Sequence, residues 1–246
     1  MHKSLKIIAA LTLLWTAGAE AAVISGEKMQ LPAKERKVDV TLFRAPGSAP
    51  RGSILILHGA GGFERQQAQY NAYAAAVANS GFDAYLVNYR SPADLKKLAA
   101  GEDVFKPRFV SWVRLVDDLV DVVKTAKGSN GKVGLIGFSD GGSIANGAAG
   151  MDKNVNAAVV YYGADAARFG IEQERFPPML LLHGEIDGTI TWMAAEELAQ
   201  HIKRMKAPVE FVLFSGERHG FGSDITTRHG GDALKRTLTF FHKNMN

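Results

Sequence analysis

After residue 35, short apolar runs rich in β-branched residues alternate with longer amphipathic stretches. The apolar runs have the length of β-strands, and those in the middle of the chain are apolar at nearly every position. Strands covered on both faces of a parallel sheet show this pattern. Seven strands are predicted, at Val38–Phe43, Ser53–Leu57, Asp83–Tyr89, Lys132–Gly137, Ala157–Tyr162, Met179–Leu182 and Glu210–Phe214.

Helices are predicted between these strands, at about 66–79, 108–126, 141–150, 192–206 and 231–243. The second has an apolar stripe at helical spacing, formed by Phe109, Trp112, Val113, Val116, Leu119, Val120 and Val123. Repeated strand–helix units predict an α/β fold with a mostly parallel, doubly wound sheet of seven or eight strands and helices on both faces. No repeat or linker divides the chain, so one domain is expected over 22–246.

The connection at residues 90–107 is longer than the others. Connections of this length often form lids or pocket walls. A short surface helix over 93–100, followed by a loop, is the alternative.

Residues 1–21 have the pattern of a signal peptide: Lys3 and Lys6, then the apolar run 7–15, then Ala19-Glu20-Ala21. The apolar run is shorter than the ~20 residues that a membrane-spanning helix needs. Cleavage is expected after Ala21, with Ala19 as the alternative and an uncleaved anchor as a further one. The protein is therefore predicted to be exported, to the periplasm or the medium, without stable membrane association after cleavage.

Composition narrows the possible classes of protein. With 46% apolar and 22% charged residues among 246, the chain is neither disordered nor fibrous. A net charge of +4, spread along the sequence, gives no indication of nucleic-acid binding. There is no cysteine, which excludes disulfides, thiolate metal sites and a cysteine nucleophile.

The strongest motif follows the predicted strand 132–137. Gly137-Phe138-Ser139-Asp140-Gly141 is a G-x-S-x-G sequence with a strand before it and a helix after it. In that context the motif predicts a sharp, strained turn that exposes a nucleophilic Ser139, with small residues where the turn is tightest. A Gly/Ser-rich loop without chemistry is the alternative.

A serine nucleophile needs a base and a carboxylate that orients the base. His219 follows the last predicted strand and is the expected base, with His229 as the alternative. Asp187 lies in the turn after strand 179–182 and is the expected acid. Glu185 and Asp165 are its rivals.

The glycine-rich turn His58-Gly59-Ala60-Gly61-Gly62 follows an early strand. We expect the backbone N–H groups of Ala60 and Asp140 to form an oxyanion hole. His58 is expected to hydrogen-bond the turn and have no catalytic role. No metal or cofactor is required by this chemistry.

From about residue 36 to 243 the chain resembles the dienelactone hydrolase family of α/β-hydrolases. The similarity is carried by Gly131–Gly142, Tyr161-Tyr162-Gly163, the 183–187 turn, His219-Gly220-Phe221 and Arg236–Phe241. It implies Ser139, Asp187 and His219 as the triad and Ala60 and Asp140 as oxyanion donors.

The chain departs from the name-giving enzymes of that family in three places. Those enzymes use a cysteine where this chain has Ser139, and a glutamate at the position of Gly59. They also have a substrate-binding arginine in the stretch that is Gly222-Ser223 here. The resemblance therefore implies a serine carboxylesterase acting on a small-molecule ester or lactone, and not the dienelactone substrate.

Several alternatives stay open. An acyltransferase would use the same residues, and a non-catalytic binding protein would keep only the fold. Phe63, Trp112, Trp192 and Phe221 could line an acyl pocket or belong to the core. A dinucleotide site is disfavoured, because position 64 of the glycine-rich turn is Glu and no acidic residue ends the next strand.

Overall fold

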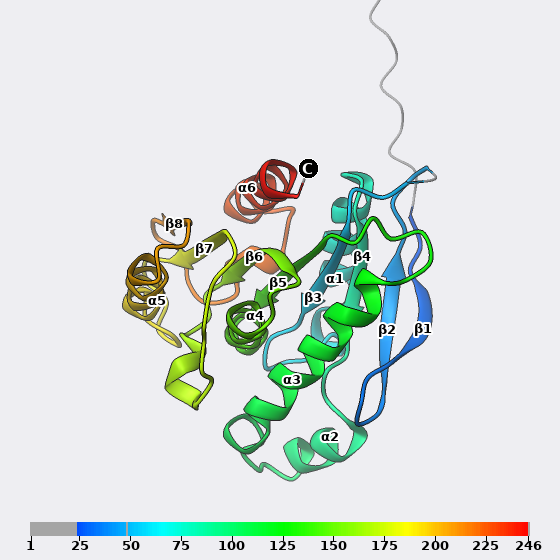
Figure 1. Ribbon diagram of the computed structural model, residues 1–246. Helices are drawn as coiled ribbons and strands as arrows, with labels where there is room; N and C mark the ends of the chain where they lie inside the picture. Colours follow the sequence, from blue (N-terminus) through cyan, green and yellow to red (C-terminus); the bar gives the residue numbers. More distant parts are fainter. Residues whose placement is uncertain (1–23, 48, 246) are drawn as a thin grey trace, which may run out of the picture.

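The computed structural model describes residues 24–47 and 49–245. The predicted signal peptide, residues 1–21, lies outside the described residues. All eight strands of the described chain form one sheet, in the order β1-β2-β4-β3-β5-β6-β7-β8 (Figure 1). The strands are β1 (Glu27–Pro32), β2 (Lys37–Phe43), β3 (Ser53–Leu57), β4 (Asp83–Val87), β5 (Val133–Phe138), β6 (Val155–Tyr161), β7 (Met179–Gly184) and β8 (Val209–Phe214).

Six helices cover the sheet: α1 (Gln67–Asn79), α2 (Pro92–Ala99), α3 (Phe105–Lys124), α4 (Asp140–Met151), α5 (Trp192–Arg204) and α6 (Arg228–Asn244). The buried residues of α3, α4 and α5 belong to one apolar core, and those of α1 and α6 belong to a second. The sheet separates the two layers (Figure 1). Strands β3 to β8 pair in parallel, whereas β2 runs antiparallel to both β1 and β4. The predicted mostly parallel, doubly wound sheet is confirmed.

The central strand β3 shows why continuously apolar runs form this sheet. Every residue of β3 is buried. Leu55 and Leu57 pack into the core under α3, while Ile54 and Ile56 pack into the core under α1. Since side chains alternate between the faces of a strand, both faces must be apolar when both are covered.

Strand β1 was not predicted. Its sequence EKMQLP has only one buried residue, Leu31, so it lacks a clear alternating pattern. It forms because it pairs antiparallel with β2 over its whole length, from Glu27 opposite Leu42 to Pro32 opposite Lys37. Helix α3 also begins earlier than expected, at Phe105, because Pro107 is tolerated in its first turn.

The long connection at 90–107 contains α2, as the short-helix alternative proposed. Ser91 and Asp94 form a reciprocal capping box at its start. Asp94 is buried, lies 3.1 Å from the Arg108 guanidinium and accepts a hydrogen bond from the Trp112 indole at 3.4 Å. This carboxylate therefore ties the connection to α3. No helix of the described chain is long and apolar enough to span a bilayer.

Replacing Asp94 with Ala should lower the free energy of unfolding by about 2 kcal/mol, because the hydrogen bonds from Ser91 to this carboxylate and the ion pair with Arg108 are lost. Burial acts to raise the pKa of Asp94, but the hydrogen bonds from Ser91 and the Arg108 charge outweigh it, so this pKa is lowered. The stabilisation is therefore present above the ordinary aspartate pKa and is lost as the pH falls through the folded-state value.

Urea unfolding at several pH values tests this prediction. The difference between wild type and Asp94→Ala should shrink in acid. Asp103→Ala is the matched control, since its exposed carboxylate accepts one hydrogen bond, from the Phe105 amide. An equal loss of stability in both variants would contradict the proposed role of Asp94.

Candidate active site

Ser139 lies at a sharp turn between β5 and α4. Its φ of 54° and ψ of −115° are in a region that residues other than glycine rarely adopt. A Cβ on Gly137 would collide with the Gly141 backbone, and one on Gly141 would collide with the backbone of residues 57 and 58. The motif thus requires glycine at both positions, as the sequence predicted. The Ser139 amide donates to the Tyr161 carbonyl at 2.9 Å, which ties the turn to β6.

Three of the predicted residues form a continuous chain of hydrogen bonds. The Ser139 hydroxyl lies 2.8 Å from His219 Nε2, and His219 Nδ1 lies 2.7 Å from Asp187 Oδ2. Since an ionised carboxylate only accepts, Nδ1 carries the proton and Nε2 is left to accept from the serine hydroxyl. The structure therefore brings together a hydroxyl, an imidazole and a carboxylate in an order suited to proton transfer.

The Asp187 side chain is fully buried, and its own partners hold it in place. Its Oδ1 accepts hydrogen bonds from the amides of Thr189 at 2.8 Å and Ile190 at 3.0 Å. His183 Nε2 donates to the Ile190 carbonyl at 2.8 Å and lies 3.3 Å from Asp187 Oδ2. Burial lowers the pKa of His183, which favours the neutral form of the ring. Sequence reasoning missed this contact, although His183 stands at the end of a predicted strand.

The rival residues all have other partners. His229 pairs with Glu217 at 2.7 Å, and Asp165 pairs with His201 at 2.8 Å. Glu185 accepts from the hydroxyl of Ser215 at 2.7 Å and from the amide of residue 216 at 3.1 Å. None of these contacts reaches Ser139, so the structure brings only His219 and Asp187 to the serine.

One expected oxyanion donor directly follows Ser139 in the chain, and the other belongs to the turn after β3. Asp140 is the first residue of α4, and so its amide has no acceptor within the helix. Ala60 is exposed and lines the same cavity as Ser139. His58, in the same turn as Ala60, donates from Nδ1 to the Gly59 carbonyl at 2.8 Å and stacks on the Tyr89 ring at 4.2 Å. Burial lowers the pKa of His58 to about 3, so the ring stays neutral.

A cavity of about 500 Å³ opens over Ser139. The Tyr70 hydroxyl accepts a hydrogen bond from the Gly59 amide at 3.2 Å, and the Tyr162 ring lies 4.7 Å from that of His219. Tyr162 also has a positive φ of 40°, directly after β6. Sequence reasoning gave neither tyrosine a role. The residues that line this cavity include Ala60, Arg65, Tyr70, Ser139, Tyr162 and His219.

The local packing explains two of the departures from the name-giving enzymes. A Cβ on Gly59 would lie 3.3 Å from both the Phe138 carbonyl oxygen and Ser139 Cβ, so a glutamate would crowd the nucleophile. A Cβ on Gly222 would press into the Tyr161 ring. At Gly222, where the resemblance places a substrate-binding arginine, a long side chain has no room.

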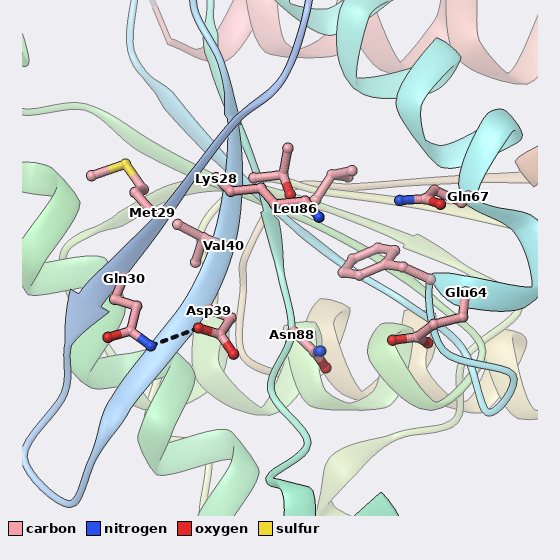
Figure 2. Close-up of a pocket in the computed structure, with 11 residues that line it drawn as sticks. Lys28, Met29, Gln30, Asp39, Val40, Glu64, Gln67, Leu86 and Asn88 are labelled. Atoms are coloured by element: carbon pink, nitrogen blue, oxygen red, sulfur yellow. Dashed lines mark hydrogen bonds between the residues drawn. The ribbon is translucent and has the colours of Figure 1, made fainter.

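A second cavity, of about 400 Å³, lies over β1, β2 and β4 (Figure 2). The Gln30 amide donates to Asp39 across it at 2.8 Å, and Lys28, Glu64 and Asn88 also line it. Phe63 lines this second cavity, and Trp112 is buried in the core, so neither forms a wall of the cavity over Ser139. Within the described residues, no group of three or more His, Asp or Glu side chains is arranged to hold a metal ion.

Comparison with solved structures identifies the same fold. A dienelactone hydrolase from Anabaena variabilis superposes with a TM-score of 0.74 at 18% identity, covering 91% of this chain and 99% of that one. An esterase from Thermogutta terrifontis, solved after reaction with tabun, superposes with a TM-score of 0.68 at 17% identity, covering 92% and 96%. The predicted α/β-hydrolase fold is confirmed by these similarities.

Among curated proteins, the chain is similar to the mitochondrial acyl-coenzyme A thioesterase 2 of mouse. The two are 29% identical over 188 residues, which is 74% of this chain and 39% of the relative. The chain thus spans about two fifths of the length of that relative. The sequence also matches the dienelactone hydrolase family over residues 38–244. Because this match covers most of the chain, the protein belongs to the dienelactone hydrolase family.

Proposed function

We propose that the protein is a serine hydrolase that cleaves a carboxylic ester through a covalent acyl-enzyme. The observation that carries this proposal is the hydrogen-bonded series from Ser139 to His219 to Asp187 beneath an open cavity. Membership of a hydrolase family supports the reaction class.

In the first step, His219 Nε2 takes the proton from the Ser139 hydroxyl as its oxygen attacks the ester carbonyl. The negative charge that develops on the carbonyl oxygen is bound by the amides of Ala60 and Asp140, each donor stabilising the transition state by roughly 3 kcal/mol. The ester C–O bond then breaks, and the leaving alkoxide receives the proton from Nε2. Asp187 stabilises the imidazolium that forms meanwhile.

In the second step, water takes the place of the alcohol. His219 accepts a proton from the water as its oxygen attacks the acyl carbonyl. The bond to Ser139 breaks, and the serine oxygen takes the proton back. An alcohol in place of water would make the protein an acyltransferase, so the ratio of hydrolysis to transfer must be measured with glycerol or methanol present.

Thioesters are a second candidate substrate class. The curated relatives at 26% to 29% identity are named acyl-coenzyme A thioesterases. The same steps would release a thiolate, which is a better leaving group than an alkoxide. Comparing kcat/KM for para-nitrophenyl acetate and acetyl-coenzyme A on the purified chain separates the two classes.

We further propose that residues 1–21 direct export, on the pattern of basic, apolar and small residues in that segment. Sequencing the N-terminus of the protein recovered from a cell's periplasm or medium should find Ala22 first, with Glu20 first if cleavage follows Ala19. An intact N-terminus on membrane-bound protein would contradict the proposal.

Ser139→Ala should lower kcat for para-nitrophenyl acetate by a factor on the order of 10⁴–10⁶, because no nucleophile remains. The variant should also lose labelling by a fluorophosphonate probe. Ser143→Ala, which changes a buried serine one turn further along α4, is the control and should be labelled normally. Full activity of Ser139→Ala would disprove the proposed function, and absent labelling of the wild type would favour a non-catalytic binding protein.

Asp187→Asn should lower kcat by about 10⁴. An Asn at this position can keep accepting from the Thr189 and Ile190 amides, which turns its NH₂ group toward His219 Nδ1. That favours the tautomer with the proton on Nε2, which cannot accept from the serine. Steady-state kinetics of Asp165→Asn provide the matched control, because this carboxylate likewise pairs with a histidine, His201, and accepts a backbone amide, that of Ala167, but its hydrogen bonds do not reach Ser139 or His219. Equal losses in the two variants would mean that Asp187 acts only through stability.

A further inference from the structure

Arg90 is the most deeply buried arginine of the described chain, with 3% of its side chain exposed. It follows β4 by three residues, at the same edge of the sheet as Ser139. Its guanidinium lies 5.6 Å from the ring centroids of both Tyr89 and Trp112, so that aromatic faces support it. Arginine is almost never buried this far without partners that use its charge and its donors.

Those partners are the two residues that carry the proposed oxyanion donors. Arg90 Nη1 donates to the Ala60 carbonyl at 2.6 Å, and Nη2 donates to Asp140 Oδ2 at 3.1 Å. Ala60 belongs to the turn after β3, and Asp140 begins α4. A single planar group therefore joins the turn that follows β3 to the first residue of α4.

The turn that carries Ala60 needs such support. Three of its neighbours, Gly59, Gly61 and Gly62, are glycines, and Gly62 has a φ of 70°. Successive carbonyls of this turn are held from the protein side, that of Gly59 by His58 Nδ1 and that of Ala60 by Arg90. Because the C=O and N–H of a trans peptide point in opposite directions, the Gly59 carbonyl held by His58 turns the Ala60 amide toward the cavity, and Arg90 fixes the next peptide unit of the turn so that this orientation is kept.

We infer that Arg90 is a positioning residue that aligns the Ala60 and Asp140 amides on one substrate oxygen. This inference rests on the proposed ester hydrolysis. Arg90 does not line the cavity over Ser139, so it acts through the two residues that it holds. The Asp140 carboxylate balances the charge of Arg90. Arg90 therefore acts on catalysis through geometry, because it holds the Ala60 and Asp140 amides in place before the oxyanion forms.

Arg90→Met tests the inference with para-nitrophenyl acetate as substrate. Loss of alignment should lower kcat by roughly 10- to 100-fold while KM stays within about twofold, since misplacement of a catalytic group by 1 Å costs up to about 100-fold. Trifluoroacetone forms a tetrahedral adduct with the serine and mimics the oxyanion. Its inhibition constant should rise by the same factor by which kcat/KM falls.

A structural role is separated from a positioning role by a second substitution. Arg90→Met leaves the Asp140 carboxylate without its partner, which destabilises the fold. Adding Asp140→Asn removes that charge and should restore thermal stability while kcat stays low. If kcat recovers together with stability, the inference is wrong. Arg90→Lys, which keeps the charge and can make one of the two hydrogen bonds, should fall between wild type and Arg90→Met.

Two controls complete the experiment. Arg108→Met removes another arginine paired with a buried carboxylate, Asp94, that touches neither oxyanion residue, and it should leave kcat per labelled molecule unchanged. The end-point of fluorophosphonate labelling counts the folded enzyme in every variant that keeps Ser139. If Ser139→Ala loses fluorophosphonate labelling but keeps its esterase activity, the proposed function is wrong. A normal kcat in labelled Arg90→Met, or a raised KM alone, would overturn only the role of Arg90.

Discussion

The left-handed backbone of Ser139 is the constraint on which the rest of the site depends. A residue with a side chain in this region costs about 1–2 kcal/mol, and it persists only where the surrounding structure leaves no alternative. Here β5 lies between β3 and β6 with both faces covered, and the glycines at 137 and 141 allow α4 to start against the end of β3. The turn therefore lifts the hydroxyl into the cavity and places the next amide beside it.

The remaining groups meet this turn because parallel strands end at one edge. Ala60 follows β3, Arg90 follows β4, Asp187 follows β7 and His219 follows β8. The charged side chains of Arg90 and Asp187 that are buried there have defined hydrogen-bond partners, which is the condition for keeping charge inside a protein. Asp187 shows this most clearly, since two amides and two imidazoles surround one carboxylate. A site built in this way is rigid before substrate enters.

Whether a strand or a contact could be predicted from the sequence depends on whether local or long-range interactions form it. β3 and β5 were predictable because burial on both faces makes nearly every residue apolar or glycine. β1 was not, since only pairing with β2 stabilises it. The supporting roles of His183 and Arg90 were missed for a related reason: a polar residue at a strand end looks the same in sequence whether it faces water or a buried carboxylate.

The fold class, the glycines that the turn at Ser139 requires, and the small set of residues at strand ends that could supply a base and an acid all follow from the sequence. The tertiary structure was needed to show which of them reach Ser139 through hydrogen bonds: His219 and not His229, and Asp187 rather than Glu185 or Asp165. All of these residues lie in connections near the carboxyl edge, so their spacing in sequence is no guide to their separation in space. The path of each loop and the register of β7 against β8 set the distances, and these depend on packing between segments far apart in the chain.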